Sequence, residues 1–273
     1  MKNNIIVTTD FSESSANALN YACGYANAHN FTILLVHIYT IPVSYAAEGL
    51  SLVAIDNDLE EDKAKLRAEL ERAKSSYPGV IIEAKMATGD YLECLKEVRR
   101  EADAGLMIMG TNGEYSELWF WDENWLDALI ALSCPVLVIP RQITYSNLKN
   151  IAFACDYKKV CEPHQSEAIK DIVKLTGASF HIVHVSQSPA KQTNINKADA
   201  IKAGFSDLSP QYHTIENSNI IRGLAGFIKQ YNIDLLLVIP RRHSVWDKLM
   251  NKSHTKQLAL LNHIPVMAIH END

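Results

Sequence analysis

The chain has 273 residues, of which 47% are hydrophobic and 21% are charged, a composition typical of a globular protein. No apolar stretch approaches the roughly 20 residues needed to span a bilayer, and the apolar run in "MKNNIIVTTDFSES" is too short for a secretory signal. We therefore expect a cytoplasmic protein without a membrane partner. The five cysteines form no Cys-x-x-Cys motif, which predicts reduced thiols rather than a disulfide scaffold or a zinc ribbon.

The net charge of −6 is shared unevenly between the two halves of the chain. Residues 1–140 hold 10 Lys and Arg against 21 Asp and Glu, whereas residues 141–273 hold 16 against 11. The balances of −11 and +5 indicate that the halves face different ligands, or each other. Neither half has the dense basic clusters with interleaved aromatic residues that favour a nucleic-acid partner.

In the first half, short runs rich in Val, Ile and Leu alternate with helical patterns, which favours a parallel sheet whose strands are buried on both faces. Ser12 is a good helix N-cap, and Pro78-Gly79 follows the end of a strong helix pattern. The patterns predict strands near 4–9, 32–38, 80–87, 105–110 and 135–139, and helices near 13–29, 57–77, 90–102 and 122–132. The apolar segment 40–58 is long for a loop, so we expect either a lid or a partner surface there.

The second half repeats the first in the same order. The runs "IIVTTD", "TILLVHIY", "DAGLMIMG" and "CPVLVIP" correspond to "IAFACD", "SFHIVHVS", "IDLLLVIP" and "IPVMAIH". Strands are predicted near 150–155, 179–185, 211–216, 234–239 and 265–269, and helices near 163–176, 194–205, 218–231 and 254–262. Each copy has the size of a domain. We therefore predict two doubly wound α/β domains, 1–141 and 147–273, with a linker at about 141–149.

The repeated order of these runs, with "VTTDFS", "GDYLECLKEV" and "IMGTNG", resembles the universal stress protein family in its tandem two-domain form. The resemblance implies a flavodoxin-like parallel sheet of order 3-2-1-4-5 in each copy, with helices on both faces. It also implies an intramolecular pseudo-dimer through the fifth strands, and leaves a homodimer open. Family members that bind ATP carry Gly-x-x-Gly, nine residues, and then Gly-Ser/Thr. The resemblance places the first aspartate, here Asp10 and Asp156, beside the adenine.

In the first copy, Gly110 and Gly113 fit Gly-x-x-Gly, but Glu123 stands at the third glycine and Asn124 at the hydroxyl. Acidic residues at a helix start stabilise their own helix and oppose a phosphate there. One interpretation is that Asp10, Gly110 and Gly113 still hold a nucleoside or another small ligand. The interpretation we favour is that the two glycines only shape a turn after a strand.

The second copy lacks the glycines, yet its charges suit an anion better. Arg241 and Arg242 stand between Pro240 and His243, and "NKSHTKQLALL" follows. Ser253 falls at the third glycine and His254 at the hydroxyl, with Thr255 next and Lys252 before. Ser253 is a good N-cap, and a helix that starts there presents backbone amides. A phosphate-like anion site, or a capped helix with a solvated basic rim, fits this pattern equally well.

Other chemistries find little support in the sequence. Neither Gly-x-Ser-x-Gly nor a Walker loop occurs, nor does any paired Cys/His set or His-Glu-x-x-His. His37 and His184 match between the copies and are expected to be partly buried and hydrogen-bonded, and Cys155 is expected to be a structural thiol.

We therefore expect a stress-response regulatory protein with degenerate nucleotide sites that acts on an unknown protein partner without turnover. The alternatives are a sensor of ATP, AMP or an anion with one altered site, or a weak ATPase.

Overall fold

The computed structural model describes residues 2–40, 52–111, 132–155, 161–187, 195–240 and 263–270. In the first half these residues form strands β1 (Asn4–Thr8), β2 (Thr32–Tyr39), β3 (Ile82–Thr88), β4 (Leu106–Thr111) and β5 (Val136–Pro140), and helices α1 (Glu13–His29), α3 (Leu52–Ser76) and α4 (Tyr91–Glu101). Residues 141–149 connect β5 to the second half without helix or strand. The domain boundary that we placed there stays a prediction.

The second half repeats this series of elements. Its strands are β6 (Asn150–Cys155), β7 (Ser179–Ser186), β8 (Gln211–Glu216), β9 (Leu235–Val238) and β10 (Val266–Ala268), and its helices are α6 (Pro163–Thr176), α7 (Ile195–Gly204) and α8 (Ile220–Gln230). A short 3-10 turn, Ser206–Leu208, was not predicted. The helices expected near 122–132 and 254–262 lie outside the described residues.

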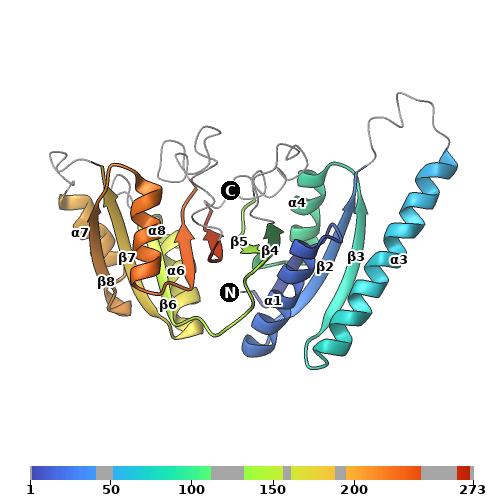
Figure 1. Cartoon of the computed structure of the whole chain (residues 1–273), viewed down its shortest axis with the longest axis horizontal. Coiled ribbons are helices and arrows are strands. Elements are labelled where there is room, and N and C mark those ends of the chain that lie inside the picture. Colours follow the sequence, from blue (N-terminus) through green and yellow to red (C-terminus); the bar gives the residue numbers. More distant parts are fainter. Residues whose placement is uncertain are drawn as a thin grey trace.

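All ten strands belong to one sheet, with the order β3-β2-β1-β4-β5-β10-β9-β6-β7-β8 (Figure 1). Within each half the neighbouring strands are parallel, and their order is the expected 3-2-1-4-5. The halves meet where β5 pairs with β10 in antiparallel orientation, with Leu137 opposite Met267. The predicted α/β fold is therefore confirmed, and the fifth strands pair within the chain as expected.

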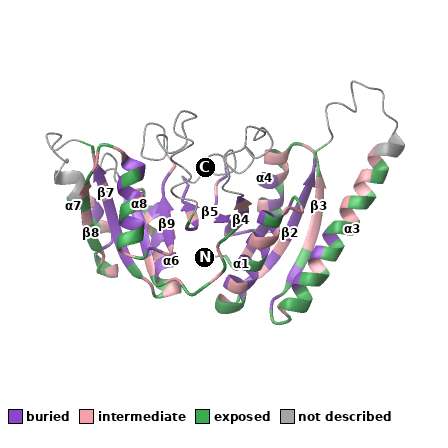
Figure 2. Cartoon of the chain, in the orientation of Figure 1, coloured by how far each residue is buried: buried purple, intermediate pink, exposed green. Residues whose placement is uncertain are grey.

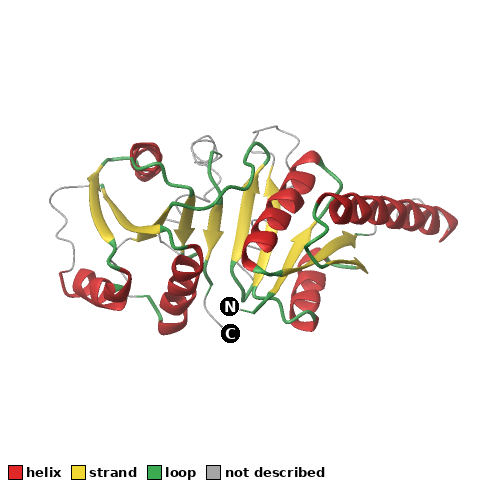
Figure 3. Cartoon of the chain, turned by 90° about the horizontal axis from the view of Figure 1, so that it is seen from below, coloured by secondary structure: helices red, strands yellow, loops and turns green. Residues whose placement is uncertain are grey.

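Helices cover both faces of this sheet, as Figure 3 shows. Successive residues of a strand point to opposite faces. On β1, Ile5 and Val7 accordingly pack into the core formed with α1, α3, α6 and α7, while Ile6 packs into the core formed with α4 and α8. Each core contains residues of both halves. The strands are largely buried, whereas the outward helix faces are exposed (Figure 2).

The helix termini are set by local hydrogen bonds. The Ser12 hydroxyl accepts from the backbone N–H of Ser15, so the predicted N-cap of α1 is confirmed. Asp90 and Asn219 cap α4 and α8 in the same way. Among the described residues, no helix combines the length and hydropathy needed to cross a membrane.

One predicted boundary is wrong. We expected the helix near 57–77 and a loop before it, but α3 already begins at Leu52. The apolar residues of "LVAI" were interpreted as part of an apolar loop, yet Leu and Ala are strong helix formers and the weaker formers Val and Ile are tolerated in a helix once it has started. Residues 41–51 of the expected 40–58 loop lie outside the described residues.

Candidate functional site: the carboxyl edge of β1 and β4

The predicted fold brings two of the expected site residues together. β1 and β4 are parallel neighbours, and the strand order reverses between them because β2 lies on the other side of β1. In open α/β sheets, ligands bind outside the carboxyl ends of the strands at such a point. Asp10 follows β1 and Gly110 lies near the end of β4. Gly113, the third residue expected here, lies outside the described residues.

A tight turn holds Asp10 at this edge. Its carboxylate accepts a hydrogen bond from the backbone N–H of Ser12 at 3.0 Å. Partial burial raises the pKa of Asp10, but hydrogen bonds from Ser12 and Ser15 lower it more, so the pKa lies below its ordinary value. Phe11, between Asp10 and Ser12, has φ of 65°. That left-handed conformation is strained for a bulky residue, and such strain concentrates at functional sites.

Gly110 is required by packing inside the protein. A Cβ built at this position would lie 2.3 Å from the carbonyl oxygen of Ser14 and 2.8 Å from the backbone nitrogen of Ser15. Both atoms belong to the first turn of α1, which therefore packs directly on the backbone of β4. This contact explains the glycine without any ligand, although Gly110 lies inside β4 and not in the turn that we expected after the strand.

Two carboxylates of helix α3 contact residues at the carboxyl ends of β1 and β2. Glu69 is 6% exposed and accepts a hydrogen bond from the Thr9 hydroxyl at 2.7 Å. The Asp62 carboxylate lies 3.2 Å from Nε2 of His37, and the ammonium group of Lys65 lies over the Phe11 ring. Sequence reasoning missed Glu69 and Asp62. A signal was present, because Asp62, Leu66, Glu69 and Ala73 recur at helical spacing and so share the face that packs on the sheet.

The two matched histidines make the same contact in both halves. Nδ1 of His37 lies 2.8 Å from the carbonyl oxygen of Thr9, and Nδ1 of His184 lies 3.0 Å from that of Cys155. A carbonyl oxygen only accepts, so Nδ1 carries a hydrogen in each ring. The expectation that these histidines are partly buried and hydrogen-bonded is confirmed. Cys155 is 7% exposed, as expected for a structural thiol.

Four carboxylates, those of Asp10, Glu13, Asp62 and Glu69, lie at this edge with the hydroxyl groups of Thr9 and of the serines that start α1. Three of them are ion-paired, Glu13 with Arg141, Asp62 with Lys65 and Glu69 with Arg72. Of the described residues at this edge, those that start α1 are already capped by Ser12. Hydroxyls and carboxylates can hold a neutral polar or a cationic group, but they oppose a phosphate. No group of three or more potential metal ligands occurs in the part of the chain that the structure describes.

The equivalent edge of the second half differs at the end of β9 and in the segment between β6 and α6. Pro240 stands at the position of Gly110, so the close approach of helix and strand backbones is not repeated. Helix α6 begins at Pro163, seven residues after Asp156, whereas α1 begins three residues after Asp10. Most residues expected in this second site lie outside the described residues, namely Asp156, Arg241, Arg242, Lys252, Ser253, His254 and Thr255.

Comparison with known proteins places the chain in a family. Residues 1–140, slightly more than half of the chain, match the model of the Universal stress protein family. No curated protein matches the chain.

Two solved structures share the fold over nearly the whole chain at low sequence identity, and a third matches about half of it. A universal stress protein from Archaeoglobus fulgidus is 17% identical, with a TM-score of 0.72 over 99% of this chain and 97% of that protein. A protein of unknown function from Pseudomonas aeruginosa is 15% identical, with a TM-score of 0.58 over 99% and 93%. A universal stress protein solved in complex with cAMP is 22% identical and covers 51% of this chain and 97% of its own, with a TM-score of 0.38.

The family model covers the half that carries Asp10 and Gly110, and the second half repeats its strand order. The chain therefore belongs to the universal stress protein family.

Proposed function

We propose that the chain is a regulatory binding protein of the stress response, that its first nucleotide site has lost the capacity to hold a triphosphate, and that it acts through a protein partner without catalytic turnover. The observation that carries this proposal is the contact of α3 carboxylates with the carboxyl end of β1, where Asp10 lies. The Thr9 hydroxyl already donates its hydrogen bond to Glu69, and the backbone of Gly110 packs against the first turn of α1.

The sequence beyond the described residues supports the same conclusion. Asp122 and Glu123 stand where family members that bind ATP present a glycine and a free helix start. A phosphate group there would meet two carboxylates in a half whose charge balance is already −11.

The proposal is tested by restoring the missing motif. The triple variant Asp122→Asn, Glu123→Gly, Asn124→Ser recreates Gly-x-x-Gly-x9-Gly-Ser. We expect ATP, AMP and cAMP to leave the melting temperature of the natural chain unchanged, and ATP to raise that of the variant by a few degrees. Mass spectrometry of the gently purified natural chain should detect no nucleotide. A co-purified triphosphate would contradict the proposal, and so would an ATP-dependent shift that Asp10→Ala abolishes in the natural chain.

A second candidate function rests on the charge of the second half. Its balance of +5, with Arg241, Arg242 and Lys252 preceding the helix start that the sequence predicts at Ser253, favours an anion or a nucleotide phosphate. If this half is an anion sensor, sulfate or ATP raises the melting temperature and the double variant Arg242→Ala, Lys252→Ala abolishes the increase. Release of inorganic phosphate during that binding would instead indicate a weak ATPase.

A further inference from the structure

The α4 face of the first half and the α8 face of the second half correspond residue by residue. Leu34 of β2 pairs with Glu83 of β3, and in the second half His181 of β7 pairs with Gln211 of β8. The N-caps Asp90 and Asn219 fix the helix register. A residue with left-handed backbone lies just beyond each helix, at the same distance from its N-cap, with φ of 47° at Asp103 and 48° at Asn232, which confirms the correspondence. Leu34, Lys85, Val98 and Ala102 therefore stand where the second half has His181, His213, Phe227 and Tyr231.

In the second half these four positions form a packed cluster of rings. The ring centroids of His213 and Tyr231 are 4.5 Å apart, those of Phe227 and Tyr231 are 4.7 Å apart, and those of His181 and His213 are 5.3 Å apart. His181 and Phe227 are almost completely buried. The rings cover the outer part of the sheet beside α8.

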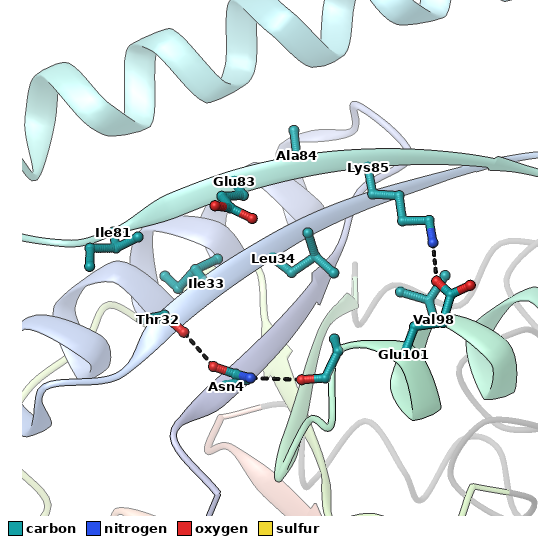
Figure 4. A pocket seen from close by; sticks show the side chains of 11 residues that line it. Asn4, Thr32, Ile33, Leu34, Ile81, Glu83, Ala84, Lys85, Val98 and Glu101 are labelled. Carbon is teal, nitrogen blue, oxygen red and sulfur yellow. Dashed lines mark hydrogen bonds and ion pairs between the residues drawn. The ribbon is translucent and has the colours of Figure 1, made fainter.

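In the first half the same place is open. The smaller or flexible side chains leave a cavity of about 550 Å³ between β2, β3 and the last turns of α4 (Figure 4). Val98 and Leu34 supply apolar surface, and Ala102 leaves the space that the Tyr231 ring takes in the other half. Ile81 at the rim is 65% exposed, the largest exposed fraction among the large apolar side chains that the structure describes.

The polar groups of the cavity are satisfied, with one exception. The Asn4 side chain donates to the Ala102 carbonyl at 2.7 Å and accepts from the Thr32 hydroxyl at 2.6 Å. Lys85 forms an ion pair with Glu101 across the opening. Glu83 is exposed and has neither an ion pair nor a hydrogen bond among the residues that the structure describes. The cavity thus offers partly apolar space, where the second half holds rings, beside an unpaired carboxylate.

We propose that this cavity is a docking site for a partner protein that inserts an aromatic side chain, with a basic residue beside it that faces Glu83. The second half shows that the surrounding fold accommodates rings at these positions. A buried aromatic side chain is a typical anchor of a protein interface. Exposed Ile81 extends the apolar surface beyond one ring, which favours a polypeptide over a small aromatic molecule, and the charge of −11 in this half favours a basic partner.

Short peptides test the proposal on the full chain. We expect Ac-Val-Tyr-Arg-NH2 to shift the amide resonances of Leu34, Glu83 and Ala102 in a saturable NMR titration. Ac-Val-Ala-Arg-NH2 should cause no saturable shift, and Ac-Val-Tyr-Glu-NH2 should bind at least about fivefold more weakly because its carboxylate faces Glu83. Glu83→Gln should weaken binding of the arginine peptide by a similar factor. The difference in affinity between this variant and the natural chain should shrink in high salt.

Filling the cavity from within gives the sharpest control. Ala102→Tyr introduces the residue that the second half has at this position, Tyr231. It should weaken binding of the tyrosine peptide at least about tenfold. Val98→Phe is a second filling variant in case the first does not fold. Tyr231→Ala makes the reverse change in the other half and should leave the first-half resonances and the affinity unchanged.

Three results would overturn the proposal. The first is the absence of a saturable shift with the tyrosine peptide, and the second is binding that survives both filling variants. The third is binding of tyramine as tight as that of the peptide, which would identify a site for a small aromatic cation. None of these outcomes depends on whether the β1–β4 edge binds ATP.

Discussion

At the scale of single residues, Gly110 is the position where the geometry leaves least freedom. The atoms that its missing side chain would meet belong to the backbone of α1, so no rotamer change relieves the overlap. The helix start and the strand must separate before any larger residue fits. Gly110 is thus a structural requirement of the first half, whatever ligand that half binds.

We predict that Gly110→Ala destabilises the protein by about 1–3 kcal/mol, the range seen when an extra methyl group is forced into a packed site. Urea unfolding at constant pH measures the change. Gly226→Ala is the matched control, because a Cβ at that position inside α8 would meet no atom within 4 Å. That change should be neutral or stabilise by up to about 1 kcal/mol. Equal stability of the two variants would show that the contact with Ser14 is absent.

The histidine pair of the second half predicts a dependence of stability on pH. Nδ1 of His181 lies 3.1 Å from Nε2 of His213. Burial, and after it the positive charge of a protonated His213, lower the pKa of His181, and burial lowers the pKa of His213. The unfolded chain therefore takes up protons at a pH where the folded chain does not. The stability is complete above the ordinary pKa of about 6.5 and falls as the pH drops below it.

Urea unfolding between about pH 7.5 and about pH 5.5 should accordingly show a falling free energy of unfolding. The double variant His181→Leu, His213→Gln should reduce this dependence to the part that other groups contribute, among them His29, whose pKa is also lowered by burial. Unchanged slopes in the double variant would mean that other groups cause the acid sensitivity.

The sequence anticipated residues whose role is local and missed those that depend on distant contacts. Ser12 was predicted as an N-cap, and His37 and His184 as hydrogen-bonded, because each role follows from a position at the end of an element. The contact between Glu69 and Thr9 joins residues 60 positions apart. Its geometry depends on the packing angle of α3, which no local pattern encodes. The cavity beside α4 became visible only when the two halves were compared through their strand register.

At the scale of elements, α3 is attached to the sheet by buried polar contacts as well as by apolar packing. The contact between Glu69 and Thr9 is buried, whereas the ion pairs on the outer side of the helix are exposed. Exposed pairs of this kind contribute little. Loss of one partner from a buried contact leaves the other without its hydrogen bond, which is costly. The attachment of α3 should therefore respond to changes at Thr9 far more than to changes on its surface.

We predict that Thr9→Val destabilises the protein by about 1–3 kcal/mol, because the buried Glu69 carboxylate loses its Thr9 donor and keeps only the longer contact with Arg72. Hydrogen exchange should show faster opening of α3 than of α1. In a Glu69→Met background the same substitution should cost less, which a double-mutant cycle measures. Lys63→Ala, which removes an exposed partner of Glu60 on the same helix, should change stability by less than about 0.5 kcal/mol. Additive effects of Thr9→Val and Glu69→Met would contradict the contact.

At the scale of the whole molecule, the order of the sheet was predictable because each half obeys the rules for parallel α/β folds. Continuous apolar runs predicted buried strands, and the internal repeat predicted that both halves share one topology. The pairing of β5 with β10 came from the family resemblance, since apolarity alone does not show which strand covers which edge. The structure adds a physical reason for that pairing. All five residues of β5 are buried, so this strand must not remain an open edge.

The last prediction concerns this shared edge. A fragment of residues 1–149 keeps β1–β5 but loses β10, and so exposes the backbone edge of an apolar strand. The unpaired N–H and C=O groups of such an edge favour pairing with a strand of another chain. We expect the fragment to form a dimer in which two copies of β5 pair in antiparallel orientation, as β5 and β10 do in the whole chain. Light scattering should give twice the mass of the fragment, and the full chain at equal concentration is the control. A stable, monomeric fragment would show that β5 does not need a partner strand, and that the two halves are held together mainly by the residues that link them.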